Sequence, residues 1–409
     1  MDITDLQIVK ALKIGKVPNK GTKRICVGRD LEIAEFERIL GFVSAGGSET
    51  RFLRGDYGSG KTFMCSVLRE LAFGHRMLVS IVNLSREVPF GKRDLVVSEI
   101  LRGLRSPDSG SACALDEIFQ TWFGNYDAGT PLEENAALEA AIKKVSAGDP
   151  GFAMGLRAYY RAYCDANDAL MQAATDWLRG ESIASEVRGQ LKVVGKLNAE
   201  SAFRRLRGVC ALMRDAGYPG LVVLIDEVES IMRLAKPQRD AAYTSMRELI
   251  DIGSDEFPYC MFLFAGTQPF FEDEFKGVAS YQALYQRVRS QQVSSGRDLR
   301  QPIIRLEEFD GRALHDVSER VRTIHGSAYE WAAKAEFPDA EMEQFIATAG
   351  AKFGEIRQKP RAYLKALVDM LDARNQRLNV RSDAVIEAAS LVEKRDANLD
   401  DDDFVEAVA

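Results

Sequence analysis

Four runs of apolar residues stand out along the chain and predict its strands. Three are almost continuously apolar, at 77–84, 221–225 and 259–265, and a shorter, half-apolar run lies at 51–54. Strands that are apolar on both faces are typical of a parallel sheet covered by helices on each side. Segments with apolar residues at helical spacing separate the runs, and the first of them begins at Asp30, a good N-cap residue. The pattern predicts an α/β fold with a parallel sheet flanked by helices.

Two regions depart from this alternation and predict helices alone. Between 106 and 198 the chain becomes alanine-rich, with helices expected at 132–147 and 155–178. We interpret this region as a helical insertion that serves as a partner or substrate surface, or as a lid. The expected division is a basic N-terminal arm (1–26), the α/β domain (27–306), a helical lid domain (307–395) and an acidic tail (396–409).

The loop after the first strand has a phosphate-binding pattern. It reads Gly-Asp-Tyr-Gly-Ser-Gly-Lys-Thr and fits GxxxxGK[ST]. A strand, a glycine-rich loop and a helix in this order aim backbone N–H groups and a helix N-terminus at one point, which attracts phosphate. Lys61 is expected to reach the β- and γ-phosphates, and the Thr62 hydroxyl to hold Mg²⁺. The nucleotide-binding residues predicted here are Gly55, Asp56, Tyr57, Gly58, Ser59, Gly60, Lys61, Thr62 and Phe63.

Polar residues end two of the buried strands. Asp226 and Glu227 follow five consecutive apolar residues, so we expect both at the carboxyl edge of the sheet, where ligands of such sheets bind. Asp226 would position Mg²⁺ opposite Thr62, and Glu227 would polarise the attacking water as a general base. Thr267 and Gln268 follow the next buried strand and could touch the γ-phosphate or the water; the alternative is a plain polar turn. Together with the phosphate loop, these strand ends predict nucleotide hydrolysis.

Arginines in the last third of the chain are further candidates. Arg287 and Arg289 begin a segment with five arginines and one acid that ends at Arg305. An arginine displayed here could stabilise transition-state charge in a neighbouring subunit's site, contact DNA phosphates, or belong to a solvated surface. Arg361 is expected in the first turn of a helix that begins with Pro360, a favoured residue at that position.

Composition and charge restrict the class of protein. The 409 residues are 46% hydrophobic and 28% charged, as in ordinary soluble proteins. A net charge of −7 argues against a general nucleic-acid coat but permits a local basic face. One such face is the span 6–29, which holds seven basic residues and no acid; it is either a solvated arm with a short helix, or an arm that contacts nucleic acid or a neighbouring subunit. Six scattered cysteines, no secretion signal and no membrane-length apolar run favour a cytoplasmic protein with reduced thiols and no membrane partner.

The assembled motifs resemble the AAA+ ATPases of the origin-recognition and helicase-loader type. The resemblance rests on Val27-Gly28-Arg29, the loop 55–62, Asp226-Glu227, Thr267-Gln268 and Pro360-Arg361. It implies that the nucleotide is ATP, that Gly28 and Arg29 cradle the adenine, and that Thr267 or Gln268 acts as sensor 1. Arg361 would be sensor 2 and reach the γ-phosphate. Proteins of this type usually append a winged-helix DNA-binding domain, which we do not expect here, and their minimal core has no counterpart of the helical insertion.

The residues around the motifs resemble one family more specifically. Residues 54–62, 225–229 and 264–267 are similar to the ATP-binding proteins of bacterial BREX-type phage-defence loci called BrxD. The resemblance implies a role in antiviral defence, loading or regulating a helicase or another DNA-processing partner. We expect a homo-oligomeric ATPase that acts on DNA directly or through that partner. The alternatives are an ATP-gated switch or scaffold with slow hydrolysis, and a DNA-binding module that uses the basic arm and the arginine segment.

Overall fold

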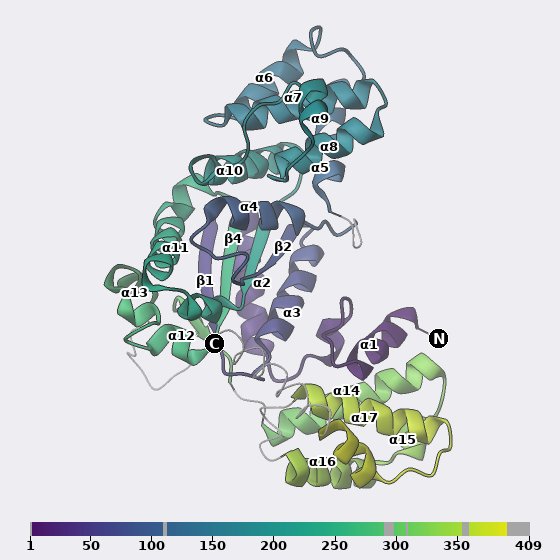
Figure 1. The fold of residues 1–409 in the computed structure, drawn as a ribbon. Coiled ribbons are helices and arrows are strands. Elements are labelled where there is room, and N and C mark those ends of the chain that lie inside the picture. The colour runs from purple at the N-terminus through teal and green to yellow at the C-terminus, as the bar shows by residue number, and fades with distance from the viewer. Residues whose placement is uncertain (1, 109–112, 290–297, 308–309, 354–359, 391–409) are drawn as a thin grey trace. The chain divides into compact units, whose positions relative to one another are not determined.

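The computed structural model describes residues 2–108, 113–289, 298–307, 310–353 and 360–390. The chain forms two compact units (Figure 1). The sheet unit comprises Ala34–Arg54 and Leu71–Ile304; the helical unit comprises Met1–Ile33, Gly55–Glu70 and the chain from Arg305 onward. Each unit has its own cluster of buried hydrophobic side chains. No helix within the described residues has both the length and the apolar character needed to cross a membrane.

A five-stranded sheet forms the centre of the sheet unit, with the strand order β2-β3-β4-β1-β5. The pairs β1–β4, β3–β4 and β2–β3 are all parallel. Every residue of β3 and β4 is buried, as expected for strands covered on both faces; in β1, the third inner strand, the last four residues are buried. The α/β class predicted from the apolar runs is therefore confirmed. The strands are β1 (Ser48–Arg54), β2 (Leu78–Asn83), β3 (Leu221–Asp226), β4 (Cys260–Gly266) and β5 (Ile303–Arg305).

Helices follow the strands and cover the sheet. In the sheet unit α11 contacts β1, and α4 contacts β2 (Figure 1). The helices nearest to the strands in sequence are α2 (Asp30–Ser44), α3 (Lys61–Gly74), α4 (Arg93–Arg102), α11 (Lys236–Glu256), α12 (Gln268–Glu272) and α13 (Gln282–Val288), with short 3-10 helices η2 (Val228–Arg233) and η3 (Val278–Ser280). Strand β5 was not expected from the sequence. It is only three residues long, which is too short to show an alternation of apolar and polar residues.

The expected helical insertion is present between β2 and β3, and α10 packs on α4. The single helix expected at 155–178 is wrong, because the chain breaks between α7 and α8. Ala166 adopts a left-handed conformation (φ 49°), and the Asn167 side chain caps the next helix by accepting a hydrogen bond from the backbone N–H of Leu170. The helices of the insertion are α5 (Leu115–Gly124), α6 (Ala136–Val145), α7 (Pro150–Cys164), α8 (Asp168–Leu178) and α9 (Ser185–Leu191), and α10 (Ala199–Asp215) connects it to β3.

The first residues of the chain, expected as a basic arm, instead form part of the helical unit. Helix α1 packs on α14 and α17 (Figure 1). Its apolar side chains Ile8, Val9 and Leu12 are buried in the hydrophobic cluster of that unit, which leaves the lysines on the outer face. The elements of this unit are α1 (Ile3–Lys13), η1 (Thr22–Ile25), α14 (Gly311–Tyr329), α15 (Ala333–Glu336), α16 (Asp339–Phe353) and α17 (Pro360–Asn375).

Candidate functional site

The glycine-rich loop follows β1 directly, and its backbone carbonyl groups contact the side chain of Lys61 in the same loop. Gly58 and Gly60 have φ values of 80° and 90°, a region that other residues rarely adopt. Helix α3 begins at Lys61, whose side chain is 8% exposed. Its ammonium nitrogen Nζ donates to the carbonyl oxygens of Gly55 (3.0 Å) and Asp56 (3.3 Å). A cation is therefore held at a helix N-terminus, inside a turn of backbone.

The residues of this loop fit a phosphate group. The Ser59 hydroxyl is buried and has no hydrogen-bond partner within the described residues. A Cβ at Gly55 would lie 2.2 Å from that hydroxyl oxygen and 3.0 Å from the Ser59 Cβ, so a side chain there would displace Ser59. A helix N-terminus, a buried ammonium group and an unsatisfied hydroxyl are the donors with which proteins bind phosphate oxygens.

Arg29 ties the loop to two other segments of the helical unit. Its guanidinium Nη2 donates to the carbonyl oxygens of Ser59 (3.2 Å) and Glu307 (2.6 Å), and Nη1 to a carboxylate oxygen of Glu32 (3.3 Å). Gly28, before it, has φ 63° and is exposed. The link from Arg29 to Ser59 and Glu307 was not foreseen from the sequence. It makes Arg29 a residue that holds the loop in shape, and it leaves the adenine role of Gly28 and Arg29 a prediction.

In the sheet unit, the predicted acids lie at the carboxyl edge of the central strands. Ile225 is in register with Phe264, and Arg54 with Gly266, so β1, β3 and β4 end at about the same level. Asp226 is buried, and its Oδ1 accepts a hydrogen bond (3.0 Å) from the backbone N–H of Glu227. The carboxyl edge thus presents a buried carboxylate followed by an exposed one.

The backbone of Glu227 is strained. The residue has φ 58° and ψ 37°, the left-handed conformation. Outside glycine and asparagine this conformation costs about 1–2 kcal/mol. Such strain is concentrated at functional positions. It turns the Glu227 carboxylate out to solvent immediately after a fully buried strand.

Thr267 and Gln268 have different surroundings. Thr267 is buried and forms the N-cap of α12, whereas Gln268 is exposed. The Gln268 amide donates to one carboxylate oxygen of Glu272 (2.7 Å), and the other oxygen pairs with the Arg54 guanidinium (2.6 Å). Arg54 is the last residue before the glycine-rich loop, so this bridge joins the entry of that loop to α12. Neither Arg54 nor Glu272 was a predicted site residue.

The Arg54–Glu272 bridge gives a stability prediction. Glu272→Gln removes the carboxylate charge beside the buried guanidinium of Arg54. Because Glu272 is itself about half exposed, we expect the free energy of unfolding in urea to fall by only about 1 kcal/mol. The matched control is Glu134→Gln, at an exposed carboxylate with no ion pair among the described residues. An equal loss in both variants would show that the bridge contributes nothing.

The predicted arginines are in three different situations. Arg287 forms a two-point ion pair with Asp251 of α11, one contact being 2.8 Å. Arg289 is exposed at the end of α13 and has no ion pair with a described residue. Arg361 is exposed in the first turn of α17, after Pro360. Of these three, Arg287 is the one that forms an ion pair with a described residue. Arg297, also in the arginine segment, lies outside the described residues.

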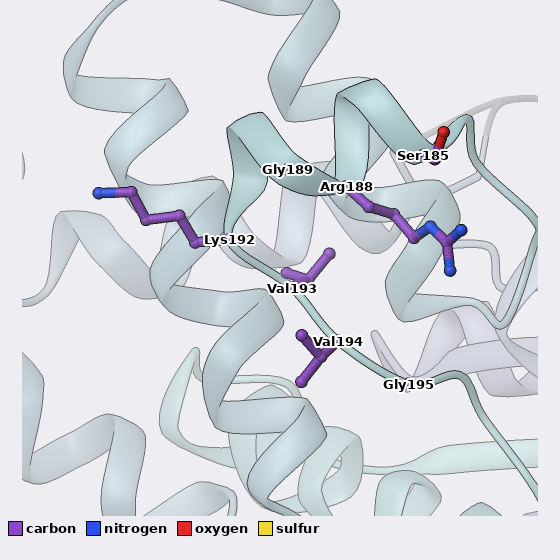
Figure 2. Close-up of a pocket in the computed structure, with 7 residues that line it drawn as sticks. All are labelled: Ser185, Arg188, Gly189, Lys192, Val193, Val194 and Gly195. Carbon is purple, nitrogen blue, oxygen red and sulfur yellow. The ribbon is translucent and has the colours of Figure 1, made fainter.

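A hollow in the helical insertion contains none of the predicted site residues. It is lined by Ser185, Arg188, Gly189, Lys192, Val193, Val194 and Gly195. Figure 2 shows the side chains of Lys192 and Arg188 extending away from Val193 and Val194 in opposite directions. Because the polar groups do not converge on one point, the hollow does not have the lining of a ligand site.

The cysteines are not paired with one another in disulfide bonds. All six cysteines are free thiols, and four of them are buried. Burial raises the pKa of the Cys26 thiol to about 11, which keeps it neutral. No cluster of three or more metal-ligating side chains occurs in the part of the chain that the structure describes.

Comparison with known proteins gives one family, and the solved structures that the chain resembles include the two described below. The sequence pattern of the family described as "BREX system ATP-binding protein BrxC/D" matches residues 3–389. The Aeropyrum pernix ORC2 protein, solved as ADPNP–ADP complexes, is 15% identical over 89% of this chain and 67% of that one, with a TM-score of 0.45. The Walker-type ATPase PABY2304 of Pyrococcus abyssi is 9% identical over 86% of this chain and 76% of that one, with a TM-score of 0.34. No curated protein matches.

Proposed function

The chain belongs to the BREX system ATP-binding protein BrxC/D family, and we propose that it hydrolyses ATP to load or regulate a helicase or another DNA-processing partner in phage defence. The family membership expected from the sequence is thereby confirmed, and with it ATP binding. The observation that carries the hydrolysis proposal is the strained, exposed Glu227 directly after the buried Asp226. Seven other non-glycine residues of the described chain share this backbone conformation, so the distinguishing feature of Glu227 is its position, as an exposed carboxylate directly after a buried one at the carboxyl edge of the sheet.

The proposed roles follow the chemistry of each group. Lys61 binds the β- and γ-phosphates, and Glu227 accepts a proton from the attacking water. Thr62 and Asp226 would hold Mg²⁺, since hydroxyl and carboxylate oxygens are the ligands that this ion prefers. When bound, Mg²⁺ would neutralise charge on the phosphate oxygens. Arg361, and Thr267 or Gln268, would contact the γ-phosphate or the water.

We propose that the protein works as a homo-oligomer in which an arginine completes a neighbour's site. Arg289 is favoured for this role over Arg287, because the charge of Arg287 is already paired with Asp251. An arginine that enters a site only in the transition state accelerates hydrolysis without adding to ground-state ATP affinity.

The first test is ATP turnover over a series of protein concentrations, with and without DNA. We expect turnover per subunit to rise with protein concentration, and Arg289→Ala to lower it by at least about tenfold while ATP affinity is kept. Arg188→Ala, an exposed arginine in the insertion, is the control and should change neither quantity. Equal turnover per subunit at every concentration would rule out shared sites. Tight ATP binding with negligible turnover under all conditions would favour the switch or scaffold instead.

A further inference from the structure

An aromatic side chain projects from the loop between α12 and η3. We call residues 272–277 the Phe275 loop. Phe275 is 84% exposed, more than any other large hydrophobic side chain of the described residues. Single exposed hydrophobic residues are common and need no explanation by themselves. The backbone around Phe275, however, is held unusually firmly.

Hydrogen bonds fix this loop on both sides of Phe275. The Asp273 Oδ1 accepts from the backbone N–H groups of Phe275 and Lys276, both at 2.8 Å. The Tyr243 hydroxyl donates to the carbonyl oxygen of Lys276 (2.6 Å). A Cβ at Gly277 would lie within 2.8 Å of three backbone carbonyl oxygens, so the close turn there requires glycine. The backbone at Phe275 is therefore preorganised, which lowers the entropy cost of ordering this loop against a partner.

Acidic residues outnumber basic ones around Phe275. Glu272, Asp273 and Glu274 precede it and the exposed Lys276 follows it, while the charge of Glu272 is already paired with Arg54. Hydrogen bonds from backbone N–H groups lower the pKa of Asp273, so it remains an anion at neutral pH. Glu274 is exposed and forms no ion pair with a described residue. A partner surface for this loop should therefore be apolar at its centre and basic around it.

The outer face of the N-terminal region has these properties. We call residues 10–23 the lysine segment. Ile14, at the C-cap of α1, is 64% exposed. Lys10 lies one helical turn before it, and Lys16 and Lys20 follow; all three are exposed and have no ion pair among the described residues. The segment contains no acid.

We propose that the Phe275 loop of one copy of this chain docks on the lysine segment of a second copy. Phe275 would cover Ile14, and Asp273 and Glu274 would face Lys10, Lys16 and Lys20. The two surfaces differ, so the contact is heterologous and generates a ring or an open filament. This contact rests on the homo-oligomer proposed above, and it assigns the two surfaces through which the copies associate.

The test is sedimentation velocity of the full-length protein with ATP over a concentration series. We expect Phe275→Ser to raise the dissociation constant of the assembly by at least about tenfold. Val194→Ser, which alters an exposed apolar side chain of the insertion (71% exposed), is the control and should leave it unchanged. Assembly unaffected by Phe275→Ser, or wild-type protein that stays monomeric at every concentration, would overturn the proposal.

A charge exchange tests whether these two surfaces meet each other. Glu274→Lys and Lys16→Glu should each weaken assembly, and the double variant should regain most of the loss because opposite charges face each other again. If Lys16→Glu lowers affinity for DNA but leaves assembly unchanged, the lysine segment is a nucleic-acid surface and the proposal fails. ATP affinity is measured in each variant. Loss of assembly with ATP affinity kept separates this contact from the nucleotide site, whose failure would appear as lost binding.

Discussion

Replacing Lys61 with alanine is expected to reduce ATP affinity by roughly 10- to 150-fold, because a charge-assisted hydrogen bond to a phosphate contributes roughly 1.5–3 kcal/mol and no other cation lies in the loop. The effect should be large because the Lys61 ammonium is already desolvated and oriented. It is buried and held by the carbonyl oxygens of Gly55 and Asp56. When a nucleotide binds, its phosphate oxygens can replace the carbonyl oxygens as acceptors for the Lys61 ammonium. The side chain is already ordered, so little conformational entropy is lost.

Isothermal titration of ATP into the wild-type protein and Lys61→Ala measures this loss. Lys92→Ala, at an exposed lysine before α4, is the matched control and should bind as the wild type does. A thermal unfolding curve of each variant without ATP shows whether the fold is kept. Undiminished affinity in a folded Lys61→Ala protein would mean that the glycine-rich loop is not the nucleotide site.

The sheet and its strand ends could be predicted because they depend on local sequence. A strand buried on both faces must be apolar throughout, and β3 and β4 are. Parallel strands end at one edge, so residues that follow them, such as Asp226 and Thr267, are placed by chain direction alone. The glycine-rich loop is likewise local, since its left-handed residues are glycines.

The contacts that hold the site could not be predicted, because they join residues far apart in sequence. Arg29 donates to Glu307, and Arg54 pairs with Glu272. An arginine carries no local sign of which distant carbonyl or carboxylate it will meet. Strand β5 presents the same difficulty. Its connection to β1 includes a hydrogen bond from the backbone N–H of Phe52 to Pro302, and three residues are too few to show a period.

The N-terminal helix is a different case. Its apolar residues have helical spacing, but the many basic residues around them led to a different interpretation. Ile8, Val9 and Leu12 are spaced as one face of a helix, and that face is buried against α14 and α17. Lys10 and Lys13 on its exposed face, and the basic residues that follow the helix, favoured the interpretation as a solvated arm. Basic residues lie only on the exposed side of such a helix. The spacing of its apolar residues is therefore the better guide to whether the helix packs against other helices.

Glu227→Gln is expected to bind ATP as tightly as the wild type and to lower turnover by at least about 100-fold, because the amide cannot accept the proton of the attacking water. Glutamine keeps the size of the side chain, so the effect isolates its basicity. Single-turnover hydrolysis measured beside ATP titration separates the chemical step from binding. Glu134→Gln, the exposed control used above, should hydrolyse ATP normally. Normal hydrolysis by Glu227→Gln would remove Glu227 from the role of general base.

A second substitution distinguishes a functional residue from a structural one at this position. Glycine adopts the left-handed conformation of residue 227 without steric cost, so Glu227→Gly should keep or raise the free energy of unfolding, by up to about 1 kcal/mol. The same variant should not hydrolyse ATP. If Glu227 were retained for stability, Glu227→Gly would have a lower free energy of unfolding than the wild type. A more stable but inactive variant would mean that the strain at the end of β3 is retained because it presents the carboxylate to the water.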